Sequence, residues 1–277
     1  MTERIDAHHH LWRYSQDEYG WIDETMAKLR RDFLPADLMA EMHTATVEGA
    51  IAVQARQTME ETRWLLEFAD QTEAIRGVVG WAPIAGDRFG AALEELAGRP
   101  KLKGLRHVVQ AEPDDNFLLR EDFNRGIRAL DGSGLVYDIL IYERHLPQTI
   151  EFVDRHPAQT FVLDHIAKPL IREKVLEPWA ARMRELAKRE SVSCKLSGMV
   201  TEADWSGWTL DSLRPYLDVV TETFGPQRLM AGSDWPVCLV ASGYAQWFGV
   251  LEEYFTEFSR QEREAIFGGN AKRVYRL

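Results

Sequence analysis

The stretch Arg4-Ile-Asp-Ala-His8-His-His10-Leu11 decides the fold of this 277-residue chain. It is predicted to form a strand, and three histidines stand where that strand ends. An open, doubly wound α/β sheet normally has a glycine-rich phosphate-binding turn at this point. Histidines in its place favour the other architecture that alternates strands with helices, the (β/α)8 barrel. The doubly wound sheet stays the second choice of fold.

Short apolar and β-branched runs alternate with helical patterns along the whole chain, which is typical of βα units around a parallel sheet. After a longer first interval, the predicted strands begin about 25 to 40 residues apart, as the units of a barrel do. A helix is predicted at Pro35–Thr44, after an extended loop. We therefore expect a single-domain α/β protein, a (β/α)8 TIM barrel over residues 1–277. Its eight strands are Arg4–Leu11, Gly49–Ala55, Gly77–Trp81, Leu102–Val109, Val136–Tyr142, Thr160–Ile166, Val192–Leu196 and Leu229–Ser233.

Composition limits the classes of partner. The formal net charge of −11 argues against nucleic acid, because phosphate binding needs a basic patch. No apolar run reaches the roughly 18 residues of a membrane helix, and the N-terminal residues lack the apolar core of a signal peptide. Cys194 and Cys238 have neither metal-ligand nor redox spacing. The expected compartment is therefore the reducing cytoplasm. The sequence indicates no oligomeric state.

The first strand carries the strongest chemical signal. Catalytic groups of a barrel come from the carboxyl ends of its strands. Side chains alternate along a strand, so His8 and His10 share one face and His9 points the other way. Two neighbouring inward imidazoles suit a zinc-like ion. We expect a metal site at His8 and His10, and a structural role for His9.

The sixth and eighth strands end in further candidates. His165 continues the inward face of its strand, and this parity predicts that Asp164 points outward. Asp234 follows small residues at the tip of the eighth strand, where a carboxylate can bind a metal or accept a proton from water. A packed core histidine and a turn-capping aspartate are the plainer interpretations.

Other strand ends offer possible substrate contacts. Arg106 suits a carboxylate or carbonyl oxygen, and because His107 has the opposite parity, at most one of the two points into the barrel mouth. Lys195 has inward parity and is predicted to hold a substrate oxygen. Gln54 and Trp81, near the ends of the second and third strands, are predicted pocket walls.

Four motifs occur in an informative order: Asp6-Ala-His8-His-His10-Leu-Trp12, Leu163-Asp-His165-Ile-Ala-Lys-Pro169, Lys195-Leu-Ser-Gly198 and Gly232-Ser-Asp234-Trp-Pro236. Together they resemble the amidohydrolase superfamily, and within it the branch of TIM-barrel hydrolases that includes L-fuconolactonases and L-rhamnonolactonases. The resemblance covers nearly the whole chain. The first and last motifs are specific for the superfamily, whereas Arg106-His107 and the lysine motif are moderately specific for the lactonase branch.

The resemblance implies a distorted barrel that opens a small-molecule sugar lactone with water. It implies metal ligation by His8, His10, His165 and Asp234, with Asp234 also the general base. Catalysis would be assisted by His165, Arg106, His107 and Lys195, and substrate would be bound by Gln54, Trp81, Arg106 and Lys195. One divalent metal is implied, zinc first, and metal-independent catalysis stays open.

The fifth strand argues against a two-metal centre, because Tyr137–Tyr142 has no histidine at its end. Nor does any lysine of the fourth strand suggest a bridging carbamate. Asp138, early in the fifth strand, is expected to be a buried structural carboxylate.

Three alternative functions stay open on the same barrel. One is non-oxidative decarboxylation of an aromatic or unsaturated acid. The second is hydrolysis of another small carboxylate-bearing ester or lactone, such as a pyrone-type dicarboxylic lactone. The third is a binding protein on an inactive barrel, since fold alone never establishes activity.

Overall fold

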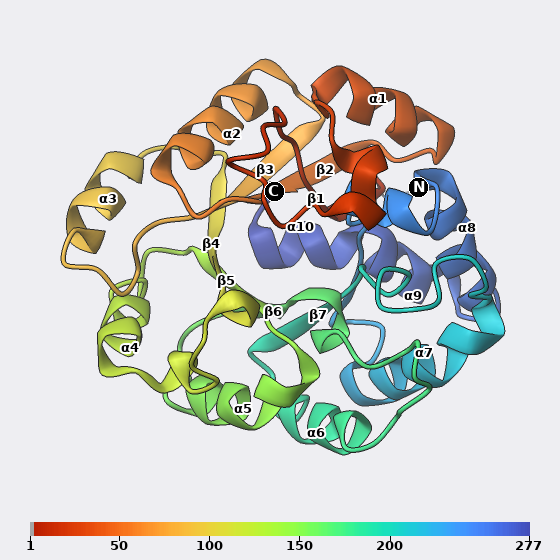
Figure 1. Ribbon diagram of the computed structural model, residues 1–277. Coiled ribbons are helices and arrows are strands. Elements are labelled where there is room, and N and C mark those ends of the chain that lie inside the picture. Colours follow the sequence, from red (N-terminus) through yellow and green to blue (C-terminus); the bar gives the residue numbers. More distant parts are fainter. Residues whose placement is uncertain (1–2) are drawn as a thin grey trace.

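The computed structural model describes residues 3–277 and contains one sheet of eight parallel strands in the order β1 to β8. Helices surround this sheet (Figure 1), and the predicted (β/α)8 barrel is confirmed. β6 and β8 have only three residues each, and the predicted strands extend beyond the observed ones at these positions and also at β1, β2 and β5. The strands are β1 Ile5–His9, β2 Gly49–Val53, β3 Ile75–Gly80, β4 Leu102–Val108, β5 Val136–Leu140, β6 Phe161–Leu163, β7 Val192–Leu196 and β8 Leu229–Ala231.

The barrel closes between β1 and the segment after β8. The backbone N–H of Asp234 donates to the carbonyl of His8 at 2.8 Å, and that of His10 donates to the carbonyl of Trp235 at 2.6 Å. These bonds set the tip of the first strand beside the tip of the last. Residues more than 220 positions apart in sequence therefore share the mouth of the barrel.

The outer helices form where the sequence supplies caps and apolar faces. In α2, for example, the hydroxyl of Thr58 accepts from the backbone of Glu61, while Leu65, Leu66 and Ala69 are buried. The predicted helix at Pro35–Thr44 is confirmed as α1. The others are α2 Met59–Gln71, α3 Phe89–Leu96, α4 Glu121–Arg128, α5 Leu146–Asp154, α6 Trp179–Leu186, α7 Leu210–Phe224, α8 Tyr244–Tyr254, α9 Arg260–Glu264 and α10 Asn270–Tyr275.

The base of the barrel is sealed by α10, which crosses behind the strands in Figure 1. Val274 and Tyr275 of this helix join an interior cluster with Ile5, Val136 and Met230 from the strands. Each buried side chain of this size contributes about 1.5–3 kcal/mol. Because apolar packing fills this end, the opposite end is left for polar chemistry.

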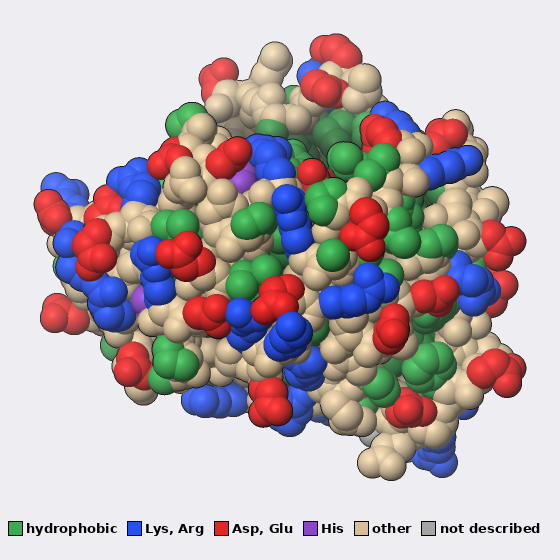
Figure 2. Space-filling model, turned by 90° about the horizontal axis from the view of Figure 1, so that it is seen from below, with side chains coloured by type: hydrophobic (Ala, Val, Ile, Leu, Met, Phe, Trp, Pro, Cys, Tyr) green, Lys and Arg blue, Asp and Glu red, His purple; other side chains and the backbone are tan. Residues whose placement is uncertain are grey.

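Figure 2 shows one outer face of the molecule, on which acidic and basic side chains are intermixed. Such a surface gives no extended field of one sign over this face. Within residues 3–277, no helix is long and apolar enough to cross a membrane.

Candidate active site

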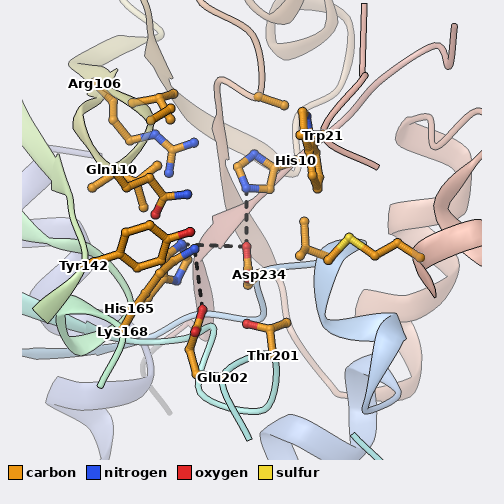
Figure 3. Close-up of a pocket in the computed structure, with 16 residues that line it drawn as sticks. His10, Trp21, Arg106, Gln110, Tyr142, His165, Lys168, Thr201, Glu202 and Asp234 are labelled. Carbon is orange, nitrogen blue, oxygen red and sulfur yellow. Dashed lines mark ion pairs between the residues drawn. The ribbon is translucent and has the colours of Figure 1, made fainter. Parts of the chain in front are cut away.

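A cavity of about 440 Å³ lies at the carboxyl ends of the strands (Figure 3). Its lining includes His10, His165 and Asp234, together with Arg106. This volume falls in the range of small-molecule sites, which is about 300–1,000 Å³. The cavity therefore has room for a ligand of monosaccharide size.

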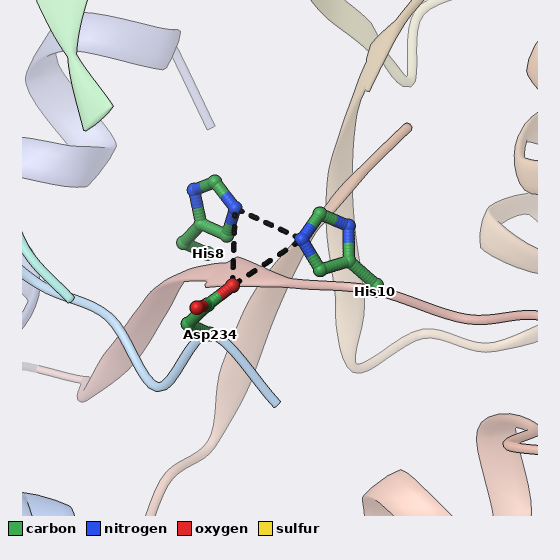
Figure 4. Close-up of side chains that lie close together, drawn as sticks. All are labelled: His8, His10 and Asp234. Carbon is green, nitrogen blue, oxygen red and sulfur yellow. Dashed lines mark hydrogen bonds and ion pairs between the residues drawn. The ribbon is translucent and has the colours of Figure 1, made fainter. Parts of the chain in front are cut away.

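The side chains of His8, His10 and Asp234 converge (Figure 4). The two Nε2 atoms lie 3.2 Å apart, and Asp234 Oδ1 lies 3.3 Å from that of His10 and 3.8 Å from that of His8. A tetrahedral zinc ion with bonds of about 2.0–2.1 Å requires ligand atoms roughly 3.3 Å apart. The donor set and its spacing therefore fit a divalent cation.

The contacts of the two rings indicate that each Nε2 carries a lone pair. His10 Nδ1 lies 2.8 Å from the carbonyl of Val53, to which it donates, so its Nε2 carries the lone pair. Arg106 can only donate and lies 3.3 Å from His8 Nε2, so that nitrogen is also an acceptor. His8 Nδ1 faces Asp164 Oδ1 at 3.2 Å. A carbonyl or carboxylate in this outer position is the usual means of orienting a metal-binding histidine.

His165 reaches the site through an unusual backbone turn. Four consecutive residues, His165 to Lys168, have φ between 47° and 60°, and none is glycine. This left-handed conformation costs about 1–2 kcal/mol per residue. The indole of Trp179 donates to the carbonyl of Ile166 at 2.8 Å and holds the turn. Strain of this kind is concentrated at functional sites.

The ring of His165 also depends on the segment after β7. Its Nδ1 lies 2.9 Å from the hydroxyl of Ser197. The next residue, Gly198, has φ 63°, and a Cβ there would lie 2.6 Å from the same ring nitrogen. Glycine is therefore required for the ring to approach this closely.

The prediction that Asp164 points outward is wrong. β6 ends at Leu163, and the left-handed turn that follows ends the alternation of side chains. Asp164 is fully buried, accepts from Arg106 Nη1 at 2.8 Å and lies 3.0 Å from Lys195 Nζ. Burial alone would raise the pKa of this carboxyl, but Lys195, His8 and Arg106 hold it well below its ordinary value.

Lys195 points inward, as its parity predicts, but it lies below the cavity and is fully buried. Its ammonium donates to Asp138 and lies 3.2 Å from His8 Nδ1. The hydroxyl of Tyr275 in α10 also donates to Asp138, at 2.8 Å. Burial raises the pKa of Asp138 to about 6. Lys195 thus contacts the site from beneath, and Asp138 is the buried carboxylate that was predicted.

Arg106 points into the barrel and lines the cavity, although only 2% of it is exposed. Its Nη2 donates to the backbone carbonyl of Gln54 and lies 3.3 Å from the amide oxygen of the same residue. Gln54 Nε2 donates to the carbonyl of Arg106 at 3.3 Å. Gln54 therefore holds Arg106 in place and does not itself line the cavity.

His107 and Trp81 lie away from the cavity. His107 points to the other face of β4, where its ring stacks on Phe117 with centroids 4.7 Å apart. Its Nε2 lies 2.6 Å from Glu112, and Trp81 Nε1 donates to its Nδ1 at 3.4 Å. Neither side chain lines the cavity, so their positions give no support to roles in catalysis or substrate binding.

Sequence reasoning missed several cavity residues. Lys168 and Glu202 form a loose ion pair of 3.7 Å, and Tyr142, Gln110 and Trp21 complete much of the wall. The motif around His165 contained Lys168, which was a usable signal. Gln110 lies in a single 3-10 turn and the others in loops, where no periodic pattern gives the direction of a side chain.

The ionisation of the site suits hydrolysis. Burial alone would raise the pKa of Asp234, but His165, His10 and Lys168 hold it below its ordinary value. Burial lowers the pKa of His165 to about 4. At neutral pH the site therefore presents a carboxylate beside neutral imidazole, which is a base with a neighbouring hydrogen-bond partner.

An eight-stranded βα barrel with two histidines and an aspartate converging at its carboxyl-terminal mouth defines the class of metal-binding barrel enzymes. The family profile described as amidohydrolase matches residues 5–277. The chain belongs to the amidohydrolase family.

Known proteins are similar over essentially the full length. The chain is 44% identical to an L-fucono-1,5-lactonase of Burkholderia multivorans, covering 99% of this chain and 96% of that protein. It is 38% identical to an L-fucono-1,5-lactonase of Burkholderia ambifaria, covering 100% and 97%. A crystal structure of an amidohydrolase from Burkholderia multivorans with bound zinc matches with a TM-score of 0.96 at 43% identity, covering 99% of each chain.

Proposed function

We propose that this chain hydrolyses the lactone of a sugar acid to the free acid, with L-fucono-1,5-lactone as the first candidate substrate. The observation that carries the proposal is the buried, ionised carboxylate of Asp234 in a cavity of monosaccharide size. Two lactonases of 44% and 38% identity over nearly the whole chain support the substrate class.

Asp234 is the general base of this reaction. Its carboxylate takes a proton from water, and the water oxygen bonds to the lactone carbonyl carbon. The bond from that carbon to the ring oxygen then breaks, and Asp234 returns the proton to the ring oxygen. The net reaction adds one water and gives a hydroxyl and a carboxylic acid, which ionises at neutral pH. Negative charge grows on the carbonyl oxygen, so cationic and N–H groups of the cavity matter most in the transition state.

The metal site is part of the same proposal. His8, His10 and Asp234 would hold one zinc ion, and His165 lies 3.9 Å from Asp234 Oδ1 at the edge of that set. When bound, zinc supplies a Lewis acid that polarises a carbonyl oxygen. Arg106 adds positive charge at the cavity wall, and His165 is placed to donate to an oxygen beside Asp234.

We also propose that residues 1–277 act as one domain in the cytoplasm. The residues assigned to catalysis come from the ends of a single set of strands. Cys194 and Cys238 are both free and buried, as befits a reducing compartment.

A pH-indicator screen tests the function. Purified protein is offered five- and six-membered aldonolactones of the L and D series, and we expect acid release, with turnover of L-fucono-1,5-lactone among the fastest. Folded protein that releases acid from none of them would contradict the proposal. Carbon dioxide released from aromatic carboxylic acids in a parallel assay would instead favour a decarboxylase.

Metal content is measured separately. Elemental analysis of protein loaded with zinc is expected to give one zinc per chain, and His10→Ala is expected to lose it. Activity after exhaustive chelation then decides whether the ion is required. Full activity in metal-free protein would assign carbonyl polarisation to Arg106 and the histidines.

A further inference from the structure

The left-handed turn of residues 165–168 directs two side chains into the cavity, and the proposed lactone hydrolysis assigns a role only to His165. His165 and Lys168 stand three residues apart and both line the cavity (Figure 3). Between them, Ile166 and Ala167 are fully buried in the core. The backbone of Lys168 is itself left-handed, with φ 47° and ψ 65°. Backbone strain over several consecutive residues is typical of functional sites, and here the strained turn places both side chains at the cavity.

Two long cationic side chains, Arg106 and Lys168, stand among the described residues of the cavity, and they differ in how they are paired. The guanidinium of Arg106 is occupied by Asp164 and by Gln54. The ammonium of Lys168 has its ion pair with Glu202 at 3.7 Å, which is too long for a hydrogen bond. Lys168 is therefore the cation that can turn to a ligand without breaking a tight contact.

The position of Lys168 indicates which part of a ligand it meets. It lines the same cavity as Asp234, and its side chain lies beside that of His165 (Figure 3), whose Nε2 is 3.9 Å from Asp234 Oδ1. The acyl carbon must also lie beside the base, because the water activated there attacks that carbon. Lys168 therefore faces the acyl end of the substrate.

On the basis of the proposed lactone hydrolysis, we propose that Lys168 binds the acyl oxygens of substrate and product. Its ammonium donates a charge-assisted hydrogen bond to the carbonyl oxygen as negative charge develops, and then to the carboxylate of the sugar acid. Glu202 is the partner that the ammonium leaves when it turns to the ligand.

Lys168→Gly is a sharp test, because glycine adopts this left-handed backbone without strain. The substitution removes the ammonium and leaves the turn intact. Lys174→Gly is the matched control: Lys174 also has a positive φ, of 56°, but it is exposed and lies outside the cavity lining. Lys168→Met, which keeps the side-chain stem and the wild-type backbone preference, is the second variant.

Three quantities are measured for each protein: kcat and KM for L-fucono-1,5-lactone, the dissociation constant of the corresponding sugar-acid anion by calorimetry, and the melting temperature. For Lys168→Gly and Lys168→Met we expect kcat/KM to fall at least 30-fold and anion binding to weaken at least 10-fold. The melting temperature of the glycine variant should be at least that of wild type. Lys174→Gly should stay within twofold of wild type in kcat/KM and binding.

A result within threefold of wild type for both Lys168 variants, in both kcat/KM and anion binding, overturns the inference. If wild-type protein binds the anion but hydrolyses no lactone, the proposed function is overturned. The calorimetric dissociation constants of the variants then still decide whether Lys168 binds the anion. Wild-type protein that does neither overturns both. Glu202→Gln should tighten anion binding several-fold, because the competing carboxylate is gone. Weaker binding in that variant would contradict this exchange of partners.

Discussion

The barrel interior holds two layers of polar side chains that differ in how tightly their charges are paired. The sealed layer lies within the strands and consists of Asp138, Asp164, Lys195 and Tyr275. The open layer lies on the cavity and consists of His10, His165, Lys168, Glu202 and Asp234. In the sealed layer, Lys195 and Asp164 are 3.0 Å apart and Tyr275 donates to Asp138 at 2.8 Å. In the open layer the contacts of His10 with Asp234, of Lys168 with Glu202 and of His165 with Asp234 measure 3.3, 3.7 and 3.9 Å.

The difference follows from access to solvent and ligand. A buried charge is removed from bulk solvent, so its burial is very costly unless the charge is paired and hydrogen-bonded. A charge on the cavity can exchange its partner for a ligand, and a loose ion pair makes that exchange easy. Substitutions in the open layer should therefore affect catalysis, and substitutions in the sealed layer should affect stability.

The largest effect is expected from Asp234→Asn. The amide cannot accept the proton of water, so kcat should fall on the order of 10²- to 10⁴-fold, the range for a positioned acid–base group. The pH-indicator assay measures the rate, and a melting temperature near that of wild type shows that the variant is folded. A folded variant with the wild-type rate would falsify the assignment of the base.

Lys195→Met should have the largest effect on stability. It leaves Asp138 and Asp164 buried without their shared cation, and such a loss costs about 3–5 kcal/mol. Denaturant unfolding measures the change in the free energy of unfolding. The matched control is Lys168→Met, which removes a cation from the open layer and should change stability far less. Equal losses in the two variants would remove the distinction between the layers.

A buried carboxylate outside both layers sharpens the comparison. Glu61 caps the backbone N–H groups of Ala55 and Arg56, and among the described residues its Oε1 has no hydrogen-bond partner. Neighbouring cations lower the pKa of Asp164. Burial raises the pKa of Glu61 to about 7, because its backbone hydrogen bonds only partly offset the desolvation.

The folded protein therefore holds the Glu61 proton at pH values where the unfolded chain, with an ordinary pKa of 4.5, has lost it. The resulting stability is present at acid pH and is lost as the pH rises through about 7, by up to about 3 kcal/mol. Glu61→Gln removes this dependence while keeping an acceptor for both N–H groups. We expect the free energy of unfolding of wild type to fall relative to that of Glu61→Gln between pH 5 and 7 and to keep a constant difference up to pH 8. A constant difference over the whole range from pH 5 to 8 would contradict the prediction.

The smallest effect is expected from Tyr275→Phe, which removes the hydroxyl that donates to Asp138 while its ring still seals the base. The loss of a hydrogen bond to a buried carboxylate should cost about 1–2 kcal/mol. Activity should change less than twofold, because Tyr275 lies at the far end of the barrel from the cavity. A large loss of kcat with unchanged stability would mean that the sealed layer acts on catalysis directly.

The sequence predicts which way a side chain points when that residue lies in or directly beside a strand. The spacing of two residues correctly predicted that His8 and His10 converge, although β1 changes register against β2 between Asp6 and His9 and ends before His10. Asp164 and Lys168 could not be placed, because the left-handed turn after β6 has no periodic signature. Parity gave the correct face for Lys195 but not its depth in the barrel.

Depth depends on the shape of the whole molecule. Lys195 is sealed off because Tyr275, from a helix at the other end of the chain, packs beneath it and shares Asp138. Local sequence around Lys195 contains no trace of that contact. Trp21 and Tyr142 reach the cavity from loops, whose paths are set by the elements they cross.

The hydrogen bonds that join β1 to the segment after β8 have a consequence for folding during synthesis on the ribosome. His8 is among the first residues to be synthesised, whereas Asp234 emerges only when most of the chain exists. Until then the early histidines have no aspartate to meet, and a nascent chain cannot assemble the cation site. The active site can therefore form only near the end of synthesis. A chain that ends before Asp234 should have no lactonase activity.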